Sequence, residues 1–162
     1  MTEFYQALEN TAFSTWVRES GSMWAYPLIL TFHSIGMGML VGFNWALDLR
    51  ILGVAPQVPL MSMERYLPWA WWGFWLNAVS GVVLTIADAS TKMISWIFGV
   101  KMGLIVIAVY VLIQIKRQVF VKHASNGKVL AAASLALWAM AITAGRLMAY
   151  IGPVSGLKDI SN

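Results

Sequence analysis

Four long apolar stretches separated by short polar segments dominate the pattern of the chain. They cover residues 23–49, 67–87, 93–115 and 129–151. Each reaches the roughly 20 residues that a helix needs to cross the hydrocarbon core of a bilayer. No stretch alternates apolar and polar residues in the way that a strand does. The pattern therefore predicts an all-α integral membrane protein, a four-helix bundle that forms one domain over residues 1–162.

A shorter amphipathic segment precedes the first apolar stretch. Phe4, Leu8, Ala12 and Trp16 recur at near-helical spacing, and polar side chains occupy positions between them. A helix with one apolar and one polar face lies in the membrane interface. We therefore expect an interfacial helix over residues 3–18.

Composition supports a membrane protein and excludes several other classes. The chain is 59% hydrophobic and 11% charged, whereas soluble domains are about 45–50% apolar and about 25% charged. Its 11 Lys and Arg residues are too few for a surface that tracks phosphates, so we expect no nucleic-acid partner. The absence of cysteine excludes thiolate chemistry. No hydrolase or nucleotide-binding motif is present, which argues against an enzyme.

The distribution of basic residues predicts the orientation of the chain. Two segments, between the first and second and between the third and fourth spans, carry six of them: Arg50, Arg65, Lys116, Arg117, Lys122 and Lys128. The opposite side carries Arg18, Lys92 and Lys158. Because cytoplasmic loops are enriched in Lys and Arg, this difference predicts that both termini lie outside the cytoplasm.

Ionisable residues inside the spans are the candidates for function, because a charged group in hydrocarbon is costly. His33 lies in the first span, Lys101 in the third and Arg146 in the fourth, while Asp88 follows the second. Counted at 1.5 Å per residue, all four fall in the outer half of the membrane. A four-helix bundle can bring them together, and we interpret them as one cluster.

Helical spacing adds a polar face to each of the first two spans. His33, Met37, Asn44 and Asp48 share one face of the first span, and Gly73, Asn77, Ser80 and Asp88 share one face of the second. Because Asp48 lies near the cytoplasmic end of its span, we expect it to form an ordinary surface ion pair with Arg50.

Small residues predict close packing of helices. Gly38 and Gly42 form a G-x-x-x-G motif on the first span, and Gly99 and Gly103 form one on the third. Such motifs let helix backbones approach in a membrane. They favour association into a homo-oligomer or with a larger membrane complex.

The leading chemical hypothesis is a haem b site for electron transfer or for a redox-accessory subunit. A neutral imidazole at His33 suits an axial ligand, and Lys101 and Arg146 nearer the same surface suit the haem propionates. The sixth position would need a second subunit, Met37 or Met102, or would remain open.

Other readings of the same residues stay open. His33 and Met37, one helical turn apart, suit a copper ion. A cofactor-free relay for protons or ions would use the cluster together with Asn44, Asn77 and Asp88. A fourth possibility is a non-catalytic assembly subunit.

Each candidate also has a purely structural explanation. Arg146 can extend to the headgroups, and Lys101 can pair with Asp88. His33 can hydrogen-bond across the helices to Asn77 or a carbonyl group.

Four segments of the chain form a distinctive pattern: Tyr26-Pro27 leading to HSIGMGMLVGFNWALDLRILG, then LPWAWWGFWLNAVSGVVLTIAD, FGVKMGLIVI and GRLMAYIG. Together they resemble a family of small bacterial four-span inner-membrane proteins of unknown function. A shorter likeness, to CopD-like copper-resistance proteins, rests on His33 with the glycines that follow it and on Lys101. The resemblance implies a bacterial inner-membrane location, hence periplasmic termini, and a four-helix core. It implies no reaction.

Overall fold

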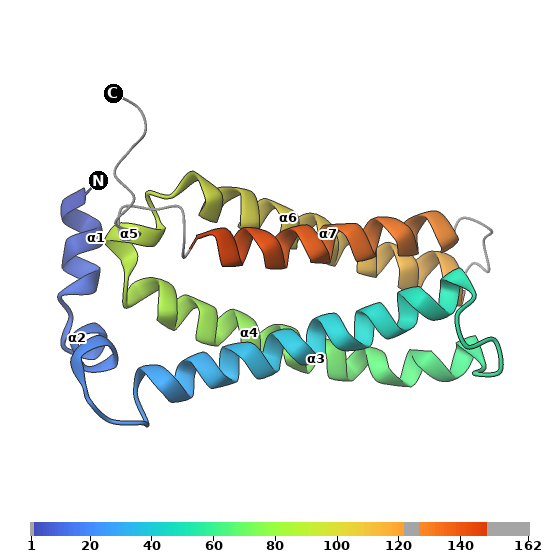
Figure 1. Ribbon diagram of the computed structural model, residues 1–162, viewed down its shortest axis with the longest axis horizontal. Helices are drawn as coiled ribbons and strands as arrows, with labels where there is room; N and C mark the ends of the chain where they lie inside the picture. The colour runs from blue at the N-terminus through green and yellow to red at the C-terminus, as the bar shows by residue number, and fades with distance from the viewer. Residues whose placement is uncertain (1, 122–126, 149–162) are drawn as a thin grey trace.

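The computed structural model describes residues 2–121 and 127–148, and their regular structure is entirely helical. Four helices are long and apolar enough to cross a membrane and run along the long axis of the molecule (Figure 1). They are α3 (Tyr26–Leu52), α4 (Leu67–Ile86), α6 (Trp96–Ile115) and α7 (Gly127–Leu147). The chain is a multi-pass membrane protein with an all-α four-helix bundle, as the sequence predicts.

Local sequence signals set the ends of the first two spans. Pro27 and Pro68 stand in the first turns of α3 and α4, where a missing N–H leaves no hydrogen bond unmade. α3 ends at Gly53, whose φ of 107° lies in the left-handed region that favours glycine. The observed spans begin and end within a few residues of the predicted ones. The predicted end of the fourth, residues 149–151, lies outside the described residues.

Two short helices lengthen the second and third spans at one end of the bundle. η1 (Leu60–Tyr66) is a 3-10 helix that leads into α4, and η2 (Lys116–Val121) is a π-helix that continues α6. We call this the η1–η2 end. The opposite end carries α1, α2 and α5 (Figure 1).

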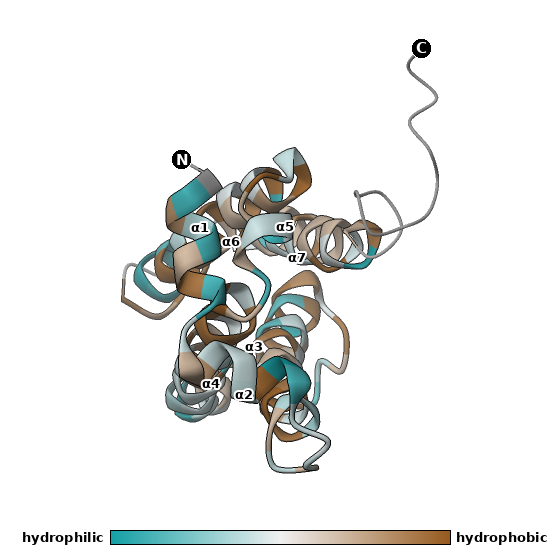
Figure 2. Cartoon of the chain, turned by 90° about the vertical axis from the view of Figure 1, so that its left-hand side faces the viewer, coloured by the Kyte–Doolittle hydropathy of each residue, from teal (hydrophilic) through white to brown (hydrophobic). Residues whose placement is uncertain are grey.

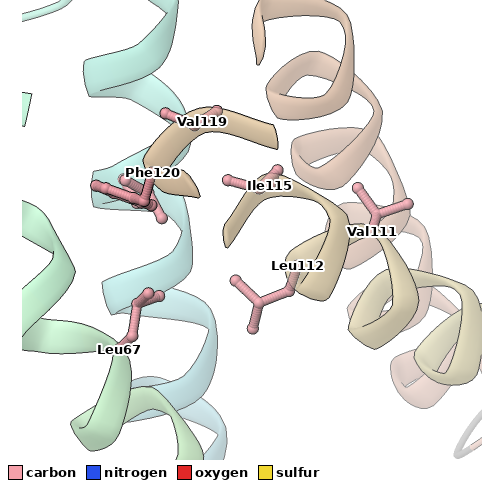
Figure 3. Packing of buried hydrophobic residues seen from close by; sticks show 7 residues of the cluster. Leu67, Val111, Leu112, Ile115, Val119 and Phe120 are labelled. Atoms are coloured by element: carbon pink, nitrogen blue, oxygen red, sulfur yellow. The ribbon is translucent and has the colours of Figure 1, made fainter. Parts of the chain in front are cut away.

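The buried core lies in two apolar clusters. A central cluster joins all four spans through Leu40, Val41, Ala70, Ala108 and Trp138. A second cluster at the η1–η2 end contains Leu47, Leu67, Val111, Leu112, Ile115, Val119 and Phe120 (Figure 3). α3 contacts both α4 and α7, and α6 contacts α7. Because α3 has no buried residue before Gly36, tight packing of this helix begins in the middle of the bundle and continues to the η1–η2 end.

The backbones of α3 and α4 approach each other closely at Gly36 and Gly73. A Cβ atom on Gly36 would lie 2.8 Å from the Gly73 carbonyl oxygen, and one on Gly73 would lie 2.7 Å from the Leu40 amide nitrogen. The two G-x-x-x-G motifs play no such part within the chain. A Cβ atom added at any of their four glycines, Gly38, Gly42, Gly99 and Gly103, would meet no described protein atom within 4 Å.

The amphipathic segment forms two helices, whereas its apolar spacing predicts one. α1 (Thr2–Glu9) and α2 (Ala12–Glu19) are separated at Thr11, whose hydroxyl accepts a hydrogen bond from the Ser14 amide at 3.3 Å. A threonine in this position caps a new helix and so ends the previous one. The two helices lie across the end of the bundle, with polar and apolar patches visible in end view (Figures 1 and 2). The prediction that residues 3–18 are largely helical is confirmed, but the prediction that they form one continuous helix is wrong.

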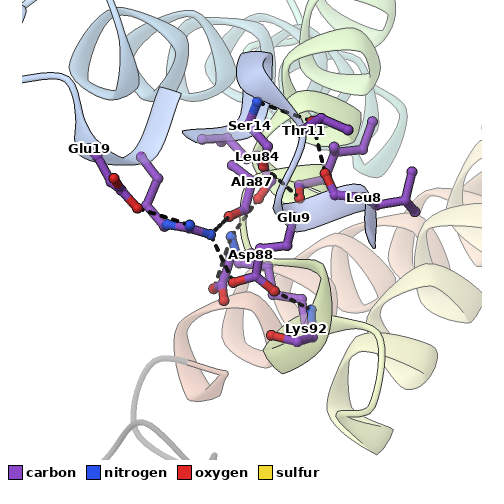
Figure 4. A network of polar contacts seen from close by, with 12 residues as sticks. Leu8, Glu9, Thr11, Ser14, Glu19, Leu84, Ala87, Asp88 and Lys92 are labelled. Carbon is purple, nitrogen blue, oxygen red and sulfur yellow. Dashed lines mark hydrogen bonds and ion pairs between the residues drawn. The ribbon is translucent and has the colours of Figure 1, made fainter. Parts of the chain in front are cut away.

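A polar network joins α1 and α2 to the short helix α5 (Ala89–Lys92) (Figure 4). Glu9 pairs with Arg18 at 2.9 Å and accepts a hydrogen bond from the Ser90 amide at 3.2 Å. Arg18 also donates to the Ala87 carbonyl at 3.3 Å. Hydrogen bonding from Ser90, helped by the positive charge of Arg18, holds the pKa of Glu9 below its ordinary value.

Acid should loosen α1 and α2 from the bundle. A carboxyl whose pKa is lowered by folding stabilises the folded state above its ordinary pKa, and this stabilisation is lost as the pH falls through the lowered value. We expect amide hydrogen exchange in α1 and α2 to accelerate in that range. Glu9→Gln should show the faster exchange already at neutral pH. Glu3→Gln, on the exposed side of α1, is the control, and faster exchange in both variants would contradict the role of Glu9.

The contact at Gly36 predicts that alanine substitutions at two glycines of α3 have different effects on stability. Gly36→Ala should lower the free energy of unfolding by about 1–3 kcal/mol, because the new methyl group forces α3 and α4 apart. Gly42→Ala on the same helix makes the same change in helix propensity without a clash, and should be neutral or slightly stabilising. Unfolding in detergent followed by circular dichroism measures both. Equal effects of the two substitutions would contradict the proposed contact.

Candidate functional site

His33 lies half-buried on α3 and ties that helix to α4. Its Nδ1 is 3.0 Å from the Asn77 backbone oxygen and 3.2 Å from the Ser80 hydroxyl oxygen. In return, the Asn77 side-chain amide donates to the His33 carbonyl at 2.8 Å. The ring lies against Gly81, where an added Cβ would be 3.0 Å from the ring carbon Cε1. The predicted hydrogen bonding of His33 across the helices to Asn77 is confirmed.

These partners determine where the imidazole carries its proton. A backbone carbonyl only accepts, so Nδ1 must be the donating nitrogen. The Ser80 hydroxyl is itself directed at carbonyl groups, and donates to Leu76 at 2.6 Å. Nε2 is therefore the nitrogen of His33 that can accept a proton or bind a metal.

Two lysines on the consecutive helices α5 and α6 lie toward the end of the bundle that carries α5. Lys92 of α5 donates to the Leu84 carbonyl at 2.9 Å. Lys101 of α6 is half-buried, and its ammonium nitrogen lies 3.5 Å from where a Cβ on Gly145 of α7 would be. Lys92 and Lys101 therefore lie at the same end of the bundle as His33, but their described contacts are to Leu84 and Gly145 and not to the imidazole.

The two other members of the predicted cluster take different positions. Asp88 pairs with Lys92 at 3.7 Å, so the structural bridge considered between Asp88 and Lys101 is not formed. Arg146 is exposed in the last turn of α7, in agreement with its extension toward headgroups. Met37 packs against the central apolar cluster.

A second polar site lies deeper in the bundle, near the η1–η2 end. Asn44 and Asp48, one turn apart on α3, are both 0% exposed. The Asn44 side chain donates to the hydroxyl of Ser134 on α7 at 3.1 Å. Among the described residues, neither Asp48 carboxylate oxygen nor Asn44 Oδ1 has a hydrogen-bond partner. Three buried acceptor atoms therefore have no hydrogen bond from any described residue, although the Ser134 hydroxyl lies near the Asp48 carboxyl.

The prediction of a surface ion pair between Asp48 and Arg50 is wrong. Arg50 instead donates to the carbonyl groups of Val58 and Pro56 in the loop that follows α3. Residues two apart on a helix do not face each other, and the apolar cluster around Leu47 covers this end of the span. The signal for a buried Asp48 was its place on the same helical face as His33 and Asn44.

The two polar sites are separated along α3. His33 and Asp48 lie about 22 Å apart at 1.5 Å per residue, and the central apolar cluster lies between them. The predicted relay residues consequently do not form one continuous chain. Asn77 belongs with His33, Asp88 with Lys92, and Asn44 with Ser134.

Comparisons with family models, curated proteins and solved structures give no match to this chain. The resemblance to four-span inner-membrane proteins and to CopD-like proteins therefore stays a prediction. Within residues 2–121 and 127–148, no three His, Cys, Asp or Glu side chains are grouped so as to hold a metal ion. The candidate chemistry consequently rests on the His33 and Asp48 sites themselves.

Proposed function

We propose that this protein is a proton- or cation-coupled transport protein of a bacterial inner membrane, with Asp48 as its intramembrane ion-binding group. The observation that carries the proposal is the complete burial of the Asp48 carboxylate inside a membrane span, where no described residue forms a hydrogen bond to either oxygen atom. Ionisable residues in such positions mark ion and proton pathways.

Desolvation explains why Asp48 needs an ion. A buried carboxylate with no partner costs several kcal/mol, and this cost disappears when the group takes up a proton or a cation. A proton on Asp48 supplies a donor for the neighbouring acceptor Asn44 Oδ1, which also has no partner among the described residues. A small cation would find the same carboxylate, the Asn44 amide oxygen and the Ser134 hydroxyl, all of them hard oxygen ligands.

His33 provides a second titratable group on the same helix. Its free Nε2 can exchange a proton at the end of the bundle that carries α5, and Asp48 can do so near the η1–η2 end. The central apolar cluster between them forms the barrier of the closed state. Transport then requires this cluster to open, as hydrophobic constrictions do in channels.

Replacing the carboxylate by its neutral isostere tests the proposal. Asp48→Asn in liposomes should abolish flux driven by a proton or sodium gradient, because the amide cannot bind and release the ion. The variant should fold at least as stably as the wild type, since it removes a buried unpaired charge. Asp88→Asn, at the partly exposed ion pair with Lys92, is the control and should retain flux.

A spectroscopic measurement supports the flux assay independently. If Asp48 takes up a proton, difference infrared spectra of the wild type should contain the carbonyl stretch of a buried carboxylic acid, and Asp48→Asn should lack it. Absence of this band together with sodium-independent flux in both proteins would contradict an ion-binding Asp48.

A haem b site for electron transfer is the second candidate, favoured by the hydrogen bond at His33. A histidine that donates Nδ1–H to a backbone carbonyl is held in the orientation and tautomer in which Nε2 binds a metal. His33 would be the axial ligand, and the half-buried Lys101 with Arg146 on the adjacent α7 would hold the propionates. The haem would supply one-electron transfer.

The absorption spectrum of the purified protein tests this candidate. A Soret band that is present in the wild type and lost in His33→Ala would support haem. His123→Ala, at the other of the two histidines, is the control and should keep the band. A colourless preparation without iron or copper by elemental analysis, expressed with an adequate haem supply, would contradict both the haem and the copper hypotheses.

A further inference from the structure

A groove of about 780 Å³ lies on the surface at the η1–η2 end, remote from His33. It is formed by η1, the first turns of α4 and the start of η2, and its polar lining residues are Glu64, Arg65 and Lys116. Its volume is in the range of ligand pockets in proteins. The groove is open, and residues from three elements line it.

The charges at the rim of the groove favour an anionic group. Arg65 and Lys116 supply two positive charges against one negative charge from Glu64. Arg65 is held in place by its hydrogen bond to the Tyr66 hydroxyl at 3.1 Å and by its position over the Tyr66 ring. Among the described residues, the ion pairs are formed by Arg18 and Lys92 at the other end of the bundle.

The rest of the groove is aromatic and extends along the span. Trp71, Trp72 and Trp75 line it, and Trp72 and Trp75 are 70% and 60% exposed. Trp75 lies eight residues beyond Leu67, the first residue of α4, hence about 12 Å deeper in the direction of the opposite end. The groove therefore changes from a charged rim to an apolar aromatic floor along the direction in which a lipid lies.

We propose that this groove binds an anionic glycerophospholipid, with its phosphodiester at Arg65 and Lys116 and an acyl chain along the three tryptophans. An aromatic belt alone needs no converging cations, whereas a phosphodiester takes a planar guanidinium and an ammonium group as partners. The excess of one positive charge favours a headgroup with a net negative charge over a zwitterionic one. Basic pockets between spans on the cytoplasmic side bind such headgroups, and the distribution of basic residues predicts that this end is cytoplasmic.

Native mass spectrometry of the full chain in detergent, with added phosphatidylglycerol, phosphatidylcholine or phosphatidylethanolamine, tests the site. The first bound phosphatidylglycerol should be favoured over phosphatidylcholine in the wild type. Arg65→Gln and Lys116→Gln should each weaken its binding about fivefold, the effect of one basic residue near an anionic lipid. Arg117→Gln is the matched control, because Arg117 is adjacent to Lys116 and of the same charge but does not line the groove.

Three outcomes would overturn the proposal. The first is equal binding of phosphatidylglycerol and phosphatidylcholine by the wild type. The second is tighter binding of phosphatidylethanolamine, whose ammonium group suits Glu64, than of phosphatidylglycerol. The third is an equal loss of phosphatidylglycerol binding in Arg117→Gln and Lys116→Gln, which would indicate a diffuse surface potential rather than a site. Circular dichroism of each variant checks that loss of binding does not reflect loss of fold.

Discussion

The contact between the backbones of α3 and α4 at Gly36 and Gly73 is the constraint on which the other features of the bundle depend. Only residues without side chains allow this approach, and it brings Asn77 within hydrogen-bonding distance of His33 in both directions. The paired helices then present one face of α3 to α7, where Asn44 reaches Ser134. Without this contact, the polar groups on α3 and α4 would face lipid, which offers no hydrogen-bond partner.

The cost of charge in hydrocarbon explains most of the remaining polar architecture. Glu9, Arg18, Asp88 and Lys92 form their ion pairs beyond the ends of the spans, and Arg50 is bound by loop carbonyl groups. Asp48 differs from these groups, because it is fully buried inside a span and has no hydrogen-bond partner among the described residues. An unpaired buried carboxylate reduces stability, and retaining it is understandable where binding of an ion is its function.

Several features followed from the sequence for clear physical reasons. A span is recognised by its own length and composition, so the four membrane helices were predicted to within a few residues. The polar faces of α3 and α4 followed from helical periodicity, which made a hydrogen bond between His33 and Asn77 one of the alternatives without selecting it. The break at Thr11 was missed because the apolar spacing continues across it, whereas the helix cap that interrupts it is a local feature of one side chain. The burial of Asp48 was missed because its nearness to the end of α3 suggested solvent.

By itself the sequence determined the membrane location, the helical class and the set of polar residues that must avoid lipid, since these depend only on hydrophobicity and on the period of a helix. The tertiary structure decided which of those residues meet. It paired Asp88 with Lys92 and placed Lys101 against Gly145. It also used Gly36 for the contact with α4, and left room for a side chain at Gly38 and Gly42 among the described residues. These outcomes depend on how far each helix is rotated about its axis and which helices are neighbours. The rotation of each helix and the choice of its neighbours are set by packing between segments that are distant in the chain. A local sequence pattern does not contain this information.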